Sequence, residues 1–160
     1  MPPYYIKMGN TATQHLALTT IRLEHDESLI FCSRIRTGLI KNVEPERIRN
    51  YTNWFTNNYL DPHFEVEEKL IFPVLGTNAR VKRALANHRR IRRLLSCGCE
   101  NQKVLNLLEE ELEAYIRFEE RILYKEIEKN TNAKQFAEFE ELHERQQFSD
   151  EEWEDKFWLE

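Results

Sequence analysis

The chain has 160 residues, and its four glycines and five prolines are too few for a sandwich or barrel of many short strands. Hydrophobic residues account for 41% and charged residues for 32%, which is typical of a soluble helical domain and argues against disorder. The formal net charge of −5 lacks the broad basic footprint of nucleic-acid-binding proteins, so we expect no nucleic-acid partner.

The first predicted helix runs from about 11 to 39, and its apolar side recurs at mixed three- and four-residue steps. The second opens at Pro45, a favourable first-turn residue, and continues to about 75. Pro62 and Pro73 should kink this helix or split it into pieces.

The third predicted helix covers about 78–96 and the fourth about 102–129, each with an inward apolar stripe. Three glycines fall where the first three helical patterns stop, and there we expect left-handed C-terminal residues; they are Gly38, Gly76 and Gly98. An acidic segment then contains a predicted helix from Ala133 to Gln146 and a tail with three anchoring aromatics. These aromatics are Trp153, Phe157 and Trp158.

Short links between long amphipathic helices favour antiparallel neighbours. The sequence therefore predicts an all-α protein, an up-down-up-down four-helix bundle with a C-terminal helical and tail extension. We expect one domain over 1–160, with the bundle at about 12–130 and the acidic tail at about 131–160.

Polar side chains interrupt the inward stripes of all four helices. They are His25, His63, Glu67, His88, Tyr115 and Glu119. The second and fourth helices each carry a ring-bearing donor followed four residues later by Glu, which places both groups of a pair on one face. Counted from the connecting loops, the six residues lie at heights that agree within roughly one or two helical turns.

Imidazole nitrogen and carboxylate oxygen are the ligands that hold iron, manganese and zinc. Two i, i+4 pairs on facing helices can place a carboxylate from each between two ions. Burying Glu67 or Glu119 in an apolar core would otherwise cost several kcal/mol, and a bound cation removes that cost. We therefore interpret the six residues as a metal site.

Four blocks carry a resemblance to a known family: His25, the run HFEVEEKLIFP over 63–73, NHRRI over 87–91 and IRFEERIL over 116–123. In this order they resemble the hemerythrin-like (HHE cation-binding) domain over about 12–130. The resemblance implies a four-helix bundle and a cofactor of two non-haem iron ions with bridging carboxylates and an oxo or hydroxo bridge. Members bind dioxygen, sense oxygen or redox state, store iron, or handle nitric oxide and peroxide.

Tyr115 departs from the family pattern, which has His-x-x-x-Glu in the fourth helix. A phenolate binds ferric iron, whereas a neutral phenol is a poor ligand. Three outcomes stay open: Tyr115 coordinates, it hydrogen-bonds to a bound water or carboxylate, or the site holds one metal ion instead of two. Because a phenolate favours ferric iron, Tyr115 argues against reversible dioxygen carriage.

The functional prediction is a non-haem iron protein in oxygen, redox, nitric-oxide or iron sensing or handling, with zinc or manganese as other possible metals. One alternative is a di-iron oxidase or peroxidase, although the sequence shows no catalytic motif beyond the metal site. The other is a partner-binding bundle with a degenerate site. Dioxygen, nitric oxide or peroxide is the expected small-molecule partner.

Several other charged residues are not expected to bind the metal directly. Glu24, Glu65, Glu68 and Glu120 are expected to be solvated or to support ligands, and His143 to be exposed. The basic stretch over 80–93 is expected to be a solvated face paired with acidic neighbours, and the alternative is a docking surface for an acidic partner or nucleic acid.

Membrane and secretion signals are missing from this sequence. No apolar stretch approaches the roughly 18 residues of a membrane-spanning helix, and the first ten residues contain no signal-peptide core. The three cysteines, Cys32, Cys97 and Cys99, lack the spacing of a disulfide framework. We therefore expect a cytoplasmic protein with no membrane partner.

Overall fold

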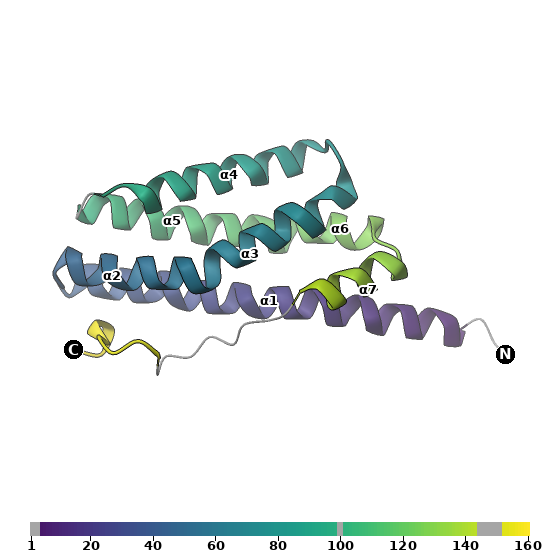
Figure 1. Cartoon of the computed structure of the whole chain (residues 1–160), viewed down its shortest axis with the longest axis horizontal. Helices are drawn as coiled ribbons and strands as arrows, with labels where there is room; N and C mark the ends of the chain where they lie inside the picture. Colours follow the sequence, from purple (N-terminus) through teal and green to yellow (C-terminus); the bar gives the residue numbers. More distant parts are fainter. Residues whose placement is uncertain (1–3, 99–100, 144–151) are drawn as a thin grey trace.

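The computed structural model describes residues 4–98, 101–143 and 152–160, without the side chains of 4–17 and 19. Its helices form four rods that run alternately up and down, which confirms the predicted all-α four-helix bundle (Figure 1). The first rod is α1, Tyr4–Ile40, and it packs chiefly against the fourth rod.

The second rod is broken into segments of different helical type. It contains α2 (Pro45–Phe55), a π-helical segment (Thr56–Leu60), α3 (Asp61–Val66), a second π-helical segment (Glu67–Ile71) and a 3₁₀ turn (Phe72–Leu75). The two predicted breaks are present: Pro62 lies in the first turn of α3, and Pro73 lies in the 3₁₀ turn.

The third rod is α4 (Ala79–Ser96), and the fourth contains α5 (Gln102–Phe118), a π-helical segment (Glu119–Leu123) and α6 (Tyr124–Asn130). Asparagine side chains cap two of these helices by accepting from backbone N–H groups in the first turn. Asn78 caps α4 and Asn101 caps α5.

Basic residues of α4 pair with acidic residues of the neighbouring rods, as predicted for the 80–93 stretch. Arg80 contacts Glu126 at 2.5 Å, and Arg90 contacts Glu111 at 2.8 Å. These partly exposed pairs contribute little stability individually, but they neutralise a helix that carries no acidic residue.

The C-terminal extension begins with α7 (Ala133–Leu142), which Asn132 and Gln135 start with a reciprocal capping box. This helix packs along α1 (Figure 1). The predicted helix reached Gln146, but α7 ends at Leu142, where His143 takes an extended backbone. Residues 144–146 lie outside the described residues.

The tail over 152–160 docks against α1 and α2 through its aromatic side chains, as predicted. Phe157 is fully buried, and the guanidinium of Arg34 lies 4.2 Å from the ring centre of Trp158. Gly38 makes room for this contact, because a Cβ there would lie 2.7 Å from a ring carbon of Phe157. Gly38 therefore does not end the first helix, which continues to Ile40.

The bundle core is apolar and aromatic, with Phe31 stacked on Phe55 at 4.2 Å between ring centres. Within the described part of the chain, every helix is too short or too polar to cross a membrane. Several of the polar side chains buried in this core lie together between the rods.

Candidate metal centre

Two glutamates hold equivalent positions in the second and fourth rods. Glu67 and Glu119 are each the first residue of a π-helical segment, and both are fully buried. Such wide turns recur at functional sites because the additional residue per turn changes which side chains face inward. Here each π-helical segment begins at the glutamate of the ligand-type pair predicted for its rod.

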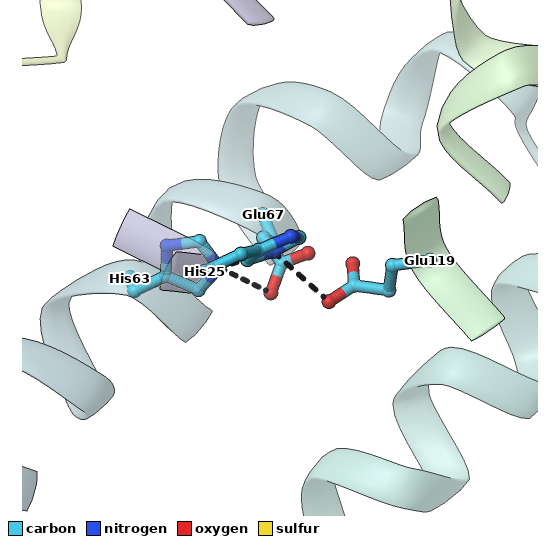
Figure 2. A group of neighbouring side chains, drawn as sticks. All are labelled: His25, His63, Glu67 and Glu119. Atoms are coloured by element: carbon cyan, nitrogen blue, oxygen red, sulfur yellow. Dashed lines mark hydrogen bonds and ion pairs between the residues drawn. The ribbon is translucent and has the colours of Figure 1, made fainter. Parts of the chain in front are cut away.

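Four of the predicted site residues converge between the rods. One ligand-type atom from each of His25, His63, Glu67 and Glu119 lies within 4.8 Å of the others (Figure 2). Nε2 of His25 lies 3.2 Å from Nε2 of His63 and 3.4 Å from Oε1 of Glu119. These distances leave room for a cation among the four side chains, with two histidines and two carboxylates as donors.

His88 and Tyr115 meet the cluster at the other side of Glu67. The Tyr115 hydroxyl lies 2.6 Å from Nε2 of His88 and 3.4 Å from Oε1 of Glu67. Nε2 of His88 lies 3.3 Å from that same oxygen. The structure therefore brings all six sequence-predicted residues into one buried cluster, in which Glu67 lies between the His63 side and the His88 side.

A seventh residue, Tyr124, belongs to this cluster and was missed by the sequence analysis. Its hydroxyl donates to Oε2 of Glu67 at 2.8 Å and lies 3.2 Å from Nε2 of His25. Tyr124 follows Glu119 by five residues, a spacing that points away on an α-helix. The π-helical segment brings it back, because the Tyr124 N–H bonds to the carbonyl of Glu119. No signal in the sequence marks that turn.

Each of the three histidines directs Nε2 into the cluster and Nδ1 toward a carboxylate outside it. This contact favours the tautomer with hydrogen on Nδ1 and leaves Nε2 free to coordinate, an arrangement that metal-binding histidines commonly show. The pairs are His25 with Glu120 at 2.7 Å, His63 with Glu24 at 3.2 Å and His88 with Glu68 at 2.7 Å.

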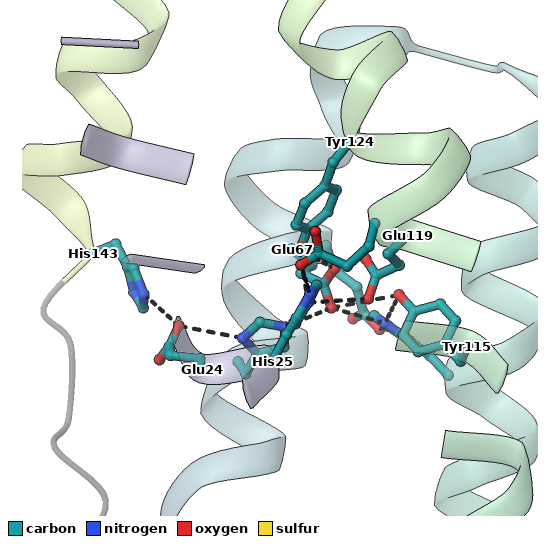
Figure 3. Close-up of polar contacts among 11 residues, drawn as sticks. Glu24, His25, Glu67, Tyr115, Glu119, Tyr124 and His143 are labelled. Carbon is teal, nitrogen blue, oxygen red and sulfur yellow. Dashed lines mark hydrogen bonds and ion pairs between the residues drawn. The ribbon is translucent and has the colours of Figure 1, made fainter. Parts of the chain in front are cut away.

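These backing carboxylates (Glu24, Glu68 and Glu120) each meet a further basic side chain. Arg22 lies 3.2 Å from Glu120, and Arg92 lies 2.7 Å from Glu68. For Glu24 the partner is His143, at 2.7 Å (Figure 3). The prediction that His143 is exposed is therefore wrong: its side chain is only 8% exposed.

The two buried carboxyl groups of the cluster, Glu67 and Glu119, have pKa values shifted in opposite directions. Burial would raise the pKa of Glu67. The charge of His63 and the hydrogen bonds that Glu67 makes outweigh this effect and hold its pKa well below the usual range. Burial and the charge of Glu67 together raise the pKa of Glu119. Burial lowers the pKa of His63, but the charge of Glu67 and the hydrogen bond to Glu24 outweigh it and raise that pKa to about 10.

Glu119 tests whether a cation fits among these residues. Both of its carboxylate oxygens are buried and accept no hydrogen bond from the described residues. Ionising a buried carboxyl group that accepts no hydrogen bond costs several kcal/mol, which agrees with the raised pKa of Glu119, and a bound cation would remove that cost. The donor set of imidazoles and carboxylates suits a first-row metal ion, so the residues fit a metal.

A cavity of about 400 Å³ borders this cluster on the His63 side. Its walls come from α1, the second rod and the end of α7, and they include Glu24, Phe55, His63, Val66 and His143. Carboxylates and apolar side chains both contribute to the lining. A small molecule therefore has room beside one of the candidate ligands.

The structure describes two of the three cysteines, Cys32 and Cys97. Cys32 is buried and burial raises the pKa of its thiol, while Cys97 is partly buried; neither forms a disulfide. Cys99 lies outside the described residues.

Comparison with known families gives one match. The model of the hemerythrin HHE cation-binding domain matches residues 16–97, which include His25, His63, Glu67 and His88. Neither a curated protein nor a solved structure matches the chain.

Proposed function

Because the match covers more than half of the chain, the chain belongs to the hemerythrin HHE cation-binding family, and we propose that it is a non-haem iron protein for oxygen, redox, nitric-oxide or iron sensing or handling. The observation that carries this proposal is Glu119, a buried carboxylate with no hydrogen-bond donor, which faces imidazole nitrogen across 3.4 Å. A cation is the partner that such a group lacks.

The donor side chains fall into two groups, and this grouping supports the binding of two iron ions. His25 and His63 supply nitrogen on one side, while His88 supplies it on the other, and Glu67 and Glu119 are available to both. The His88 side is short of one donor. Tyr115 lies 2.6 Å from His88, so we assign it as a ligand there.

Tyr124 is assigned a different role. It lies on the side that already has two imidazoles, and its hydroxyl donates to Oε2 of Glu67 at 2.8 Å. This bond fixes the orientation of the carboxylate that both sides share. Tyr124 is therefore assigned as a hydrogen-bond donor to a ligand, because its hydroxyl donates to Glu67.

Iron bound here would supply redox change and an open position for a small ligand. The chain's own residues hold the donors in place and exclude water. Phe64 stacks on the His88 ring at 3.9 Å between centres, which closes that side with apolar surface. The Nδ1 contacts fix the direction of each imidazole.

A second candidate function is an oxygen- or peroxide-activating enzyme. The cavity of about 400 Å³ beside His63 favours it, since this space could hold a small substrate next to the centre. Peroxide turnover above that of free iron, lost in His63→Ala, would support this alternative.

Elemental analysis tests the proposal. Protein from iron-rich cells should contain about two iron ions per chain. Glu67→Ala should lose most of this iron, while Glu65→Ala, an exposed change two residues away, should keep it. Equal metal content in Glu67→Ala and the parent protein would contradict the proposal.

A further inference from the structure

The three backing carboxylates differ in the origin of the base that holds them. Arg22 and Arg92 come from the first and third rods, so they belong to the bundle itself. His143 comes from the residue after α7, outside the four rods (Figure 3). It also lies beyond residues 16–97, to which the family model applies.

His143 reaches the cluster through a single oxygen atom. Oε1 of Glu24 lies 2.7 Å from Nε2 of His143 and 3.2 Å from Nδ1 of His63. Both imidazoles therefore donate to the same acceptor, so His143 sets the position of the atom that His63 requires. The side chains are largely shielded, with 8% exposed for His143 and 12% for Glu24.

The same three residues share a wall of the cavity beside the centre. Leu142 and Glu141 of α7 complete that wall. The end of α7 thus bounds the space next to His63 and also supplies the hydrogen bond that orients the His63 ring through Glu24. A displacement of α7 would alter both at once.

We propose that His143 is a positioning residue for the metal centre, which acts through Glu24 to hold Nε2 of His63 toward the metal. The C-terminal extension, through the residue that follows α7, then contributes to the geometry of the metal centre. This inference rests on the proposed metal-binding function, because the benefit of orienting His63 is realised only when it coordinates an ion.

The first test measures how fast iron leaves the protein. Iron(II)-loaded protein is mixed anaerobically with an excess of a ferrous chelator, and the release rate is followed by absorbance. His143→Leu should release iron about tenfold faster, since residues that orient ligands typically change metal affinity by about 10- to 100-fold. His143→Gln, which keeps a donor, should release iron at nearly the parent rate.

A matched control separates this effect from damage to α7. Glu140→Gln changes an exposed residue of α7 that does not line the cavity, and it should leave the release rate unchanged. If His143→Leu loses helix content, the Gln variant still decides the matter: equally fast release from both variants would overturn the proposal.

A double-mutant cycle tests whether His143 acts through Glu24. Glu24→Gln should itself speed iron release, and adding His143→Leu to it should produce little further change. Effects that multiply would mean that His143 acts independently, and would overturn the inference. Parent-like release from His143→Leu would overturn it while leaving iron binding intact, whereas a parent protein that binds no iron would overturn both proposals.

Discussion

Nε2 of His25 and Nε2 of His63 face each other across 3.2 Å in the buried centre of the bundle. Their Nδ1 atoms contact carboxylates, so the favoured tautomer of each ring directs a lone pair at the other. Two facing lone pairs at this distance need a positive charge between them. The pKa of His63, raised to about 10, favours a proton on that ring in the metal-free protein, and a metal ion would replace it.

This relationship predicts that iron affinity rises with pH. The pKa of His63 is raised to about 10 in the metal-free protein, so at neutral pH a metal ion must displace its proton. Displacing the His63 proton by itself makes the apparent affinity increase about tenfold per pH unit below that value, and protons released from Glu119 or Tyr115 would make the slope steeper. Competition titrations with a chelator between about pH 6 and 8 would measure the slope. A pH-independent affinity would contradict the assignment of His63 as a ligand.

Glu119→Gln should separate metal binding from stability. The variant loses a ligand, so iron affinity should fall by at least about tenfold. The free energy of unfolding of the metal-free protein should change by less than about 2 kcal/mol, because burial and the charge of Glu67 raise the pKa of Glu119 and favour its neutral form, which Gln resembles. Chemical denaturation of metal-free protein and metal analysis measure the two effects.

The control for this variant is Glu110→Gln, an exposed change on the same rod. It should change neither the iron affinity nor the free energy of unfolding. Marked destabilisation of the metal-free Glu119→Gln protein would show that the carboxylate has a structural role instead.

The two buried tyrosines should differ in their optical effects. If Tyr115 coordinates ferric iron as a phenolate, the ferric protein has a visible charge-transfer band that Tyr115→Phe abolishes. Tyr124→Phe should retain the band, because Tyr124 is assigned as a donor to Glu67. Loss of the band in Tyr124→Phe alone would reverse the two assignments.

Docking of the tail should depend on Gly38. In Gly38→Ala the new Cβ would lie 2.7 Å from Phe157 and 3.0 Å from Ile48, so the tail must shift. Such overpacking costs about 1–3 kcal/mol of stability. Faster proteolysis within the tail and a changed Trp158 fluorescence would report the shift. Gly98→Ala, where nothing lies within 4 Å, is the matched control.

The sequence was sufficient to predict the bundle, because hydrophobic periodicity and helix-ending signals agree along the four rods. Pro45, for example, was predicted to start a helix, and α2 begins at that residue. Gly38 was misinterpreted as a helix end, since a tertiary contact with Phe157 explains it better than local conformation does.

The candidate site was predictable only in part, for a physical reason. His63 with Glu67, and Tyr115 with Glu119, follow α-helical spacing and could be found by counting residues. Tyr124 could not, because it reaches the centre through a π-helical segment with no sequence signature. His143 was missed as well, because its contact with Glu24 depends on how α7 packs against α1.

The most direct test is an anomalous-difference map from crystals of protein purified from iron-rich cells, with data collected at the iron absorption edge. We expect two iron peaks inside the cluster, one beside His25 and His63 and one beside His88 and Tyr115. Glu67 should lie between them. A map with no peak among these side chains, from protein whose histidines keep the positions described, would contradict the account.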